Sequence, residues 1–138
     1  GKIAPDFTQN DPQGKPVSLY GIKAKLKILD FWASWCGPCR AETPNVRRMY
    51  EKYKGAGLEI ISVSLDTKRE NWLNAIETDG MEWINTSDLQ GWNNAVAKLY
   101  GIRSVPAIFV LDENNRIIGQ DLRGKELEET IRKALEGK

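Results

Sequence analysis

The residues best suited to chemistry are two cysteines that lie three positions apart, in the stretch Trp35-Cys36-Gly37-Pro38-Cys39. They are the only cysteines among 138 residues. A thiolate is the attacking group in disulfide exchange, and a second thiol close to it can displace the mixed disulfide that forms first. The spacing therefore predicts a redox-active pair, in which Cys36 attacks and Cys39 resolves.

The expected backbone around the pair favours this chemistry. A buried strand is predicted to end just before Cys36, and a helix is predicted to begin there. The free N–H groups of a first helical turn stabilise a thiolate and lower the pKa of its thiol. Gly37 lets a substrate approach the backbone, and Pro38 restricts the turn without removing a hydrogen bond that the helix needs. We therefore expect an exposed Cys36, with Cys39 held just behind it.

Three other roles for the cysteine pair have less support. Structural zinc needs four ligands, whereas this chain has no histidine and no third cysteine. A purely structural disulfide across so short a loop would remove little chain entropy and would stabilise the fold weakly. Two inert buried thiols would not need glycine and proline between them, since these residues fill a core poorly. We therefore expect no metal site.

Two carboxylates lie near the pair in the sequence. Asp30 interrupts an apolar run six residues before Cys36, and burial there would raise the pKa of its carboxyl group into the range that suits proton transfer near neutral pH. The alternative for Asp30 is a surface residue at a strand end. Glu42 lies about one helical turn beyond Cys39, and its alternative role is that of an exposed residue that complements the helix dipole.

Proline and tryptophan residues add further expectations. Pro44 lies inside the predicted helix and should kink it, because proline removes one backbone hydrogen bond. Trp35 is expected in an apolar contact surface beside the cysteines, and Trp32 in the core. Pro106 follows Val105 at the start of a strand, where an ordinary trans proline is the usual case and a cis bond is rare. The tryptophans assigned to packing in the core or in the inserted segment are Trp72, Trp83 and Trp92.

Composition narrows the class of protein. The chain has 41% hydrophobic and 28% charged residues, and its formal net charge of +1 gives no support for nucleic-acid binding. No apolar run approaches the roughly 18 to 20 residues that span a bilayer, and none has the pattern of a signal peptide. Because the chain begins with Gly1 rather than Met, we expect a domain processed or excised from a longer or membrane-anchored protein.

The predicted elements put the cysteine pair at the end of a central strand. Paired turn signals in residues 5–22 predict a small N-terminal hairpin. The nearly continuous apolar run of residues 25–34 predicts a strand buried on both faces. Residues 36–54 predict the helix that carries the cysteines at its start, and residues 58–65 predict a second strand.

The second half of the chain continues this alternation of strands and helices. Residues 66–92 are polar, contain one short helix, and are interpreted as an insertion. Residues 93–101 predict a helix that stops at a glycine, residues 106–120 predict a hairpin, and a last helix follows. The first of these helices should place Val96, Leu99 and Tyr100 together. The expected core face of the last helix consists of Leu127, Ile131 and Leu135, with Gly137 just beyond its end. This order indicates a single α/β domain over residues 1–138, with helices on both faces of its sheet.

Three stretches carry a resemblance to a known family. DFWASWCGPCR resembles the active-site segment of the thioredoxin superfamily, and the order of elements agrees with that fold over nearly the whole chain. More narrowly, the chain is similar to the TlpA and ResA-like thiol-disulfide oxidoreductases in APDFTQNDPQGKPVSL, in WCGPCRAETP, and in the inserted segment before LYGIRSVPAIFVLDENNRIIG. The resemblance implies a thioredoxin fold: a mixed central sheet flanked by helices, an N-terminal β-hairpin extension, and an insertion between the second strand and the next helix.

The resemblance also implies roles for individual residues. It implies a cis bond before Pro106, with this proline packed against the sulfurs and the Val105 backbone paired with an extended substrate. It gives Asp30 a part in deprotonating Cys39, although many TlpA-like relatives have asparagine there. It puts Glu42 in a cavity beside the cysteines, where a glutamate tunes their acidity and the recognition of partners.

The activity that the resemblance implies is thiol-disulfide exchange. No bound cofactor is needed, because electrons pass between protein dithiols. The expected partners are protein thiols or disulfides, which would dock beside Trp35 and Val105, and an upstream dithiol donor. The expected location is extracytoplasmic, either periplasmic or anchored to a membrane. Glycine and proline between the cysteines favour a reductant, with a potential nearer to about −270 mV than to about −120 mV.

Three other activities remain open on the sequence alone. A disulfide oxidase or isomerase on the same fold would differ in its reduction potential. A thiol peroxidase is a second possibility, because peroxiredoxins share the PDF opening, but their Thr-x-x-Cys arrangement is missing. A redox-inert module that only binds partners is the third, and slow alkylation of reduced Cys36 would favour it.

Overall fold

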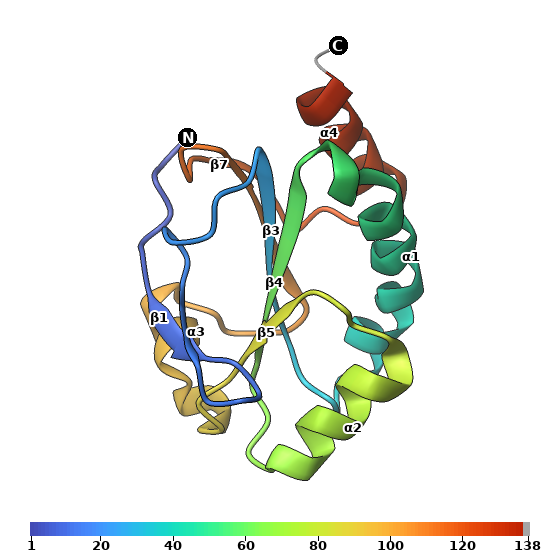
Figure 1. Ribbon diagram of the computed structural model, residues 1–138. Helices are drawn as coiled ribbons and strands as arrows, with labels where there is room; N and C mark the ends of the chain where they lie inside the picture. The colour runs from blue at the N-terminus through green and yellow to red at the C-terminus, as the bar shows by residue number, and fades with distance from the viewer. Residues whose placement is uncertain (137–138) are drawn as a thin grey trace.

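The computed structural model describes residues 1–136, which form a five-stranded mixed sheet and a separate two-stranded hairpin (Figure 1). The strand order in the sheet is β5-β4-β3-β6-β7, so β3 lies at its centre. β3, β4 and β5 run parallel, whereas β6 runs antiparallel to β3 and to β7. The expected helix end at Gly137 lies outside the described residues. The strands are β1 (Thr8–Asn10), β2 (Pro16–Ser18), β3 (Leu26–Trp32), β4 (Leu58–Ser64), β5 (Ile84–Thr86), β6 (Ala107–Asp112) and β7 (Ile117–Gln120).

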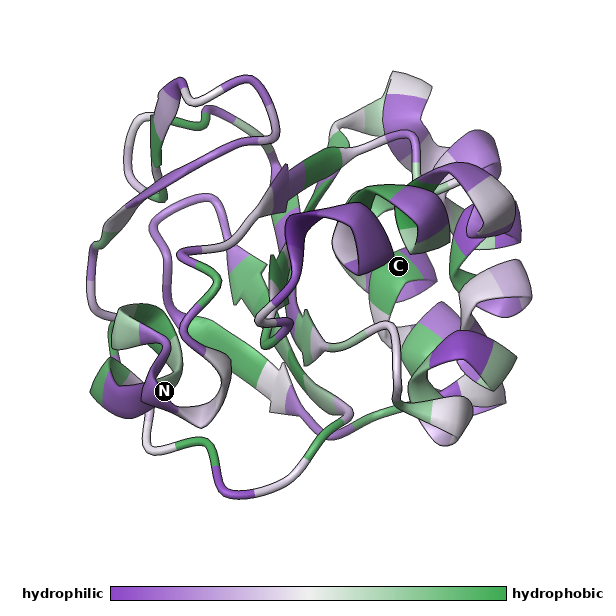
Figure 2. Ribbon diagram, turned by 90° about the horizontal axis from the view of Figure 1, so that it is seen from below, coloured by the Kyte–Doolittle hydropathy of each residue, from purple (hydrophilic) through white to green (hydrophobic). Residues whose placement is uncertain are grey.

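Helices lie on both faces of this sheet. α1 and α4 contact each other on one face, and α3 lies on the opposite side with the hairpin of β1 and β2 (Figure 1). Figure 2 shows hydrophobic strands between helices whose outward surfaces are largely hydrophilic. The predicted thioredoxin architecture, with its N-terminal hairpin, is therefore confirmed. The α-helices among residues 1–136 are α1 (Gly37–Tyr53), α2 (Arg69–Asp79), α3 (Ala95–Leu99) and α4 (Gly124–Glu136), with 3-10 helices at Lys54–Ala56 and Gly91–Asn93.

The central strand β3 positions the cysteine pair. Every residue of β3 is buried except Asp30, which is half-buried. The buried apolar side chains between two layers of helices contribute about 1.5–3 kcal/mol each, which explains why the continuous apolar run found in the sequence forms this strand. β3 ends at Trp32 and α1 begins at Gly37. The cysteines therefore lie where the carboxyl end of the central strand meets the first turn of a helix.

Helix α1 agrees closely with its predicted bounds of residues 36–54. Its buried side chains recur at helical spacing, so one face packs on the sheet while the other faces solvent. The helix continues through Pro44, and the kink expected there stays a prediction. The buried residues of α1 are Cys39, Thr43, Val46, Met49 and Tyr53.

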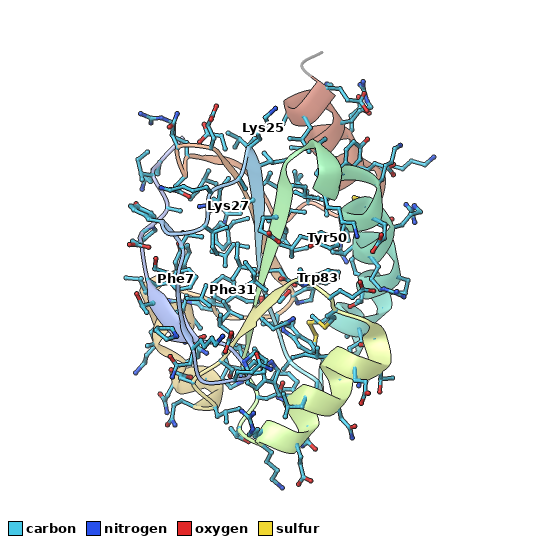
Figure 3. The ribbon with its side chains drawn as sticks, in the orientation of Figure 1. Phe7, Lys25, Lys27, Phe31, Tyr50 and Trp83 are labelled. Atoms are coloured by element: carbon cyan, nitrogen blue, oxygen red, sulfur yellow. A yellow bond between two sulfur atoms is a disulfide. The ribbon has the colours of Figure 1, made fainter. Side chains whose placement is uncertain are left out.

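The N-terminal extension is fastened to the opposite face of the sheet by aromatic contacts. Tyr100, just after α3, donates its hydroxyl hydrogen to the Pro5 carbonyl at 2.6 Å, and its ring meets Phe7 edge to face with centroids 6.2 Å apart. Phe31 of β3 lies on the same side of the sheet as Phe7 (Figure 3), and its ring centroid is 5.6 Å from that of Tyr100. The extension is thus part of the core.

The inserted segment contains a strand that the sequence pattern did not reveal. Between β4 and α3 the chain forms α2, which was expected, and then β5, which adds a parallel strand to the edge of the sheet beside β4. β5 has three residues, Ile-Asn-Thr, and shows no apolar run. Trp72 and Trp83 are buried in the core, as expected.

Two large apolar side chains of this region lie at the surface. Leu99 is 51% exposed, because the short helix α3 buries Val96 and Ala97 instead, and a residue two positions after Ala97 lies about 200° around the helix from it. Trp92 is 49% exposed. It belongs to the surface 3-10 helix Gly91–Asn93, so its ring lies outside the core rather than inside it.

Candidate active site

Cys36 and Cys39 are joined by a disulfide, with their Cα atoms 5.3 Å apart (Figure 3). Cys36 is the residue that caps the N-terminus of α1, and its sulfur accepts a hydrogen bond from the Cys39 N–H at 3.2 Å. A first-turn N–H therefore points at this sulfur, as the sequence predicted. Such a donor stabilises the thiolate that forms when the disulfide is reduced.

The expected difference in exposure between the two cysteines is absent. Cys36 is 5% exposed and Cys39 is 7% exposed, so the expectation of an exposed Cys36 is wrong for the oxidised protein. In the disulfide each sulfur covers one side of the other. Gly37 and Pro38, which separate the cysteines, are the exposed residues of this turn.

The Val105–Pro106 peptide bond is cis, as the resemblance implied. Pro106 precedes β6, and it lines a small cavity together with Cys39 and Asp30. Val105 is half-buried in the same loop. The loop that leads into β6 thus lies next to the cysteine pair at the carboxyl end of β3.

Asp30 lies within β3 rather than at its end. Its carboxylate accepts a hydrogen bond from the Ser62 hydroxyl, which in turn accepts one from the Trp83 indole N–H at 2.8 Å. Burial raises the pKa of Asp30 to about 7, against the opposing effect of the Ser62 hydrogen bond. The carboxyl group therefore changes its protonation state in the neutral pH range.

A cavity of about 20 Å³ connects Asp30 with Cys39, and Glu42 and Pro106 also line it. A volume of roughly 10–15 Å³ is enough for one water molecule when polar groups are present to bind it. A single water in this cavity could carry a proton between the Asp30 carboxyl group and the Cys39 sulfur.

Glu42 joins two helices. Its Oε2 atom accepts hydrogen bonds from the Gly124 N–H of α4 at 3.1 Å and from the Asn45 amide at 3.0 Å. The side chain is half-buried and satisfies a free N–H at the start of α4, so the alternative of an exposed residue that serves only the dipole of α1 is wrong. Glu42 also lines a larger groove, of about 470 Å³, beside the disulfide. The other residues of this groove are Pro38, Ala41, Pro106, Ile108, Asp121, Leu122 and Arg123.

An exposed aromatic pair lies next to the cysteines. Trp35 is 56% exposed, as expected for a contact surface, and its ring centroid is 6.2 Å from that of Trp92. Trp92 comes from the inserted segment, so the insertion reaches the surface beside the dithiol. Sequence reasoning did not find this pair, because 57 positions separate the two tryptophans in the sequence.

Comparison with known proteins agrees with this geometry. The AhpC/TSA family matches residues 1–120. The chain belongs to this family. Thiol-disulfide oxidoreductase ResA of Bacillus thuringiensis is 32% identical over 135 residues, which cover 98% of this chain and 76% of that protein. ResA of Geobacillus thermodenitrificans is 30% identical over 136 residues, which cover 99% of this chain and 76% of that protein.

Solved structures of similar proteins extend the match to three dimensions. The thioredoxin domain of a thiol-disulfide oxidoreductase from Bacteroides vulgatus gives a TM-score of 0.90 at 35% identity, covering 98% of this chain and 96% of that one. A thiol:disulfide interchange protein from a Bacteroides species gives 0.89 at 35% identity, covering 99% and 90%. Together with the Cys36–Cys39 disulfide, these relatives identify this AhpC/TSA family member as a ResA-like thiol-disulfide oxidoreductase of the thioredoxin superfamily.

Two further findings concern metal sites and membrane-spanning helices in the described part of the chain. Among residues 1–136, no group of three or more His, Cys, Asp or Glu side chains could hold a metal ion. No helix within the described part of the chain is both long and apolar enough to cross a bilayer.

Sequence reasoning missed the polar contacts that hold the loop before Cys36. Asp66 accepts hydrogen bonds from the Ser34 N–H at 3.2 Å and from the Ser34 hydroxyl at 2.5 Å. Arg40 donates to the Ser34 carbonyl at 3.2 Å and forms a two-point ion pair with Asp79. The only sequence signal was a charged residue, Arg40, directly after the second cysteine.

Proposed function

We propose that this thiol-disulfide oxidoreductase works as a reductant of disulfides in other proteins. The observation that carries the proposal is the Cys36 sulfur at the N-terminus of α1, bonded to Cys39 and accepting its N–H. Glycine and proline between the cysteines favour a potential on the reducing side, near the thioredoxin value of about −270 mV.

The reaction transfers two electrons in two exchange steps. The Cys36 thiolate attacks one sulfur of the partner disulfide, forms a mixed disulfide, and releases the other partner sulfur as a thiolate that takes up a proton. Cys39, once deprotonated, attacks the Cys36 sulfur and releases the second partner thiolate, which is also protonated. The partner disulfide is reduced to two thiols, and the Cys36–Cys39 disulfide forms.

Asp30 is proposed as the base for the second step. Its carboxyl group and the Cys39 sulfur line the same small cavity, and burial raises its pKa to about 7. A base with a pKa near the working pH accepts a proton and gives it up again efficiently. In the reduced protein, Asp30 would take the Cys39 proton through one water as Cys39 attacks.

The proposed partners are proteins with accessible disulfides. We propose that an extended segment of the partner docks against Trp35, Gly37 and Pro38, with its backbone beside Val105 and the cis Pro106. An upstream dithiol donor would then reduce the Cys36–Cys39 disulfide again, without a bound cofactor. By family resemblance, the proposed location of the protein is extracytoplasmic. We also propose that residues 1–138 form a single domain.

The midpoint potential of the Cys36–Cys39 couple tests the direction of electron flow. The protein is equilibrated in dithiol buffers of known potential, and its reduced fraction is read by alkylation and mass shift. We expect a reversible couple near or below about −250 mV. A value between about −180 and −120 mV would instead make the protein an oxidase or isomerase, and the absence of a reversible couple would leave only a binding role.

A further inference from the structure

Arg40 connects the active-site loop to the inserted segment. It lies one residue after Cys39, and its guanidinium group folds back toward the N-terminus of α1, where it donates to the Ser34 carbonyl at 3.2 Å. Its other nitrogens donate to the two carboxylate oxygens of Asp79, at 2.7 Å and 3.0 Å. Asp79 is the last residue of α2. One side chain thus touches the loop that carries Cys36 and the helix of the insertion.

The loop is held from its other side by the same inserted segment. Asp66, at the start of the insertion, is 1% exposed and accepts from both the N–H and the hydroxyl of Ser34. The Ser64 hydroxyl donates to the second Asp66 oxygen at 2.5 Å. With the Arg40 contact added, the N–H, carbonyl and hydroxyl of Ser34 all have charged partners, so this residue is fixed two positions before Cys36.

The Arg40–Asp79 contact also decides the charge at this end of α1. The first turn of α1 has no acidic residue. Asp79 is the carboxylate that pairs directly with Arg40, and Asp66 adds a weaker attraction. The side chains of Arg40 and Asp79 are 34% and 16% exposed, and the two-point geometry is the strongest form of this ion pair. Asp79 therefore both neutralises the guanidinium and holds it in place.

We propose that Asp79 of the inserted segment is a positioning residue for the dithiol, which sets the redox equilibrium of Cys36 and Cys39 by pairing with Arg40. The inference rests on the proposed dithiol function. It assigns the insertion a chemical task, because the segment that extends the sheet also brings the carboxylate that balances the cation beside the active-site loop.

The direction of the effect follows from the charge of the reduced state. Reduction produces a thiolate at Cys36, whereas the disulfide is neutral. A cation near the start of α1 favours the thiolate and makes the dithiol easier to form, so that the protein becomes more oxidising. Removing the Asp79 charge should therefore raise the potential, and removing the Arg40 charge should lower it.

The test is a double-mutant cycle on the midpoint potential. Asp79→Asn keeps the size of the side chain but removes its charge, and we expect it to shift the dithiol–disulfide equilibrium constant about threefold, or about 15 mV, toward the reduced form. Arg40→Gln should shift the equilibrium in the opposite direction. The double variant should have the same potential as Arg40→Gln alone, because Asp79 acts through Arg40 and has no further effect once the guanidinium group is removed.

Glu82→Gln is the matched control. Glu82 lies in the same insertion and pairs with Arg47 at 3.6 Å on the surface, with both side chains about half exposed, so the variant removes one negative charge without touching the active-site loop. Its potential should equal that of wild type. Circular dichroism checks the fold of each variant. If one of the two single variants fails to fold, the other still tests the predicted direction of the potential shift.

The outcomes separate this inference from the proposed function. A reversible wild-type couple together with an unchanged potential in Asp79→Asn would overturn the role of Asp79 and leave the dithiol function intact. An equal shift in Glu82→Gln would also overturn it, since the effect would then be one of general charge. If the wild-type protein showed no reversible couple, both the proposed function and this inference would fall.

Discussion

Asp30 is the residue whose charge the fold controls most directly. Its folded pKa is raised to about 7 from 3.8 by burial, so between these two values the folded protein binds more protons at this site than the unfolded chain does. Stability from Asp30 is therefore lost as pH rises from 3.8 toward 7. A buried carboxyl group in a central strand thus lowers the stability of the folded protein at neutral pH. A function can explain why it is there, and its position beside Cys39 supports proton transfer from that thiol.

Replacing Asp30 with asparagine should uncouple stability from activity. We expect Asp30→Asn to be more stable than wild type at pH 8, by an amount on the order of a few kcal/mol, and equal to it below about pH 4. We expect the exchange rate of wild type to rise around pH 7, and the same variant should lose this rise. Denaturant unfolding and insulin reduction across pH 4–9 measure both effects. An unchanged pH profile of the rate would reject the proton role.

Two elements, α1 and α4, are linked at the active site through Glu42. The carboxylate satisfies the N–H of Gly124, the first residue of α4. Glu42 also lines the small cavity beside Cys39 and the larger groove next to Pro38. The contact therefore acts as a cap for α4 supplied by another helix. This arrangement explains how one glutamate can serve both helix packing and the surroundings of the dithiol.

Truncation of Glu42 separates these two uses. Glu42→Ala should lower the free energy of unfolding by about 1 kcal/mol, the usual cost of losing a helix cap. Glu42→Gln keeps an acceptor for the Gly124 N–H and should cost less. If Glu42 also tunes the cysteines, Glu42→Gln will still shift the thiolate titration of reduced Cys36, measured by absorbance at 240 nm. A titration equal to that of wild type would leave Glu42 with the capping role alone.

Elements with a continuous pattern were predictable, and contacts across the fold were not. The apolar run of β3 and the spacing of Val46 and Met49 in α1 predicted both elements with bounds close to those observed. The three residues of β5 carry no such pattern, because a short edge strand is defined by its pairing with β4. The ends of α3 and the exposure of Leu99 likewise depend on what the helix packs against.

The same limit applies to the candidate site. The Cys36–Cys39 spacing and the proline after Val105 are local signals, and both led to the observed geometry. The contact between Ser34 and Asp66 joins residues 32 positions apart, and the Arg40–Asp79 pair joins residues 39 positions apart. Tertiary packing alone brings such pairs together, so a single sequence does not reveal them.

At the scale of the whole molecule, a buried lysine links distant segments of the chain on the side of the sheet away from α1. Lys27 of β3 is 1% exposed, and its ammonium group donates to the Leu19 carbonyl at 2.7 Å and to the Asn115 side-chain oxygen at 2.8 Å. Leu19 ends the N-terminal extension, and Asn115 lies in the turn between β6 and β7. Figure 3 shows Lys27 reaching from the central strand toward the N-terminal part of the chain. One side chain thus connects three distant segments.

Lys27→Met tests whether this buried lysine supports the fold. The variant leaves two acceptors without a donor, and we expect the free energy of unfolding at pH 7 to fall by about 1–3 kcal/mol. Burial lowers the pKa of Lys27 from 10.5, so above its lowered pKa the folded protein binds fewer protons at this site than the unfolded chain. Wild type should therefore gain stability relative to the variant as pH rises toward 10.5. Urea unfolding of both proteins between pH 7 and 10.5 measures the difference in the free energy of unfolding. A difference that narrows as pH rises would contradict the lowered pKa of Lys27.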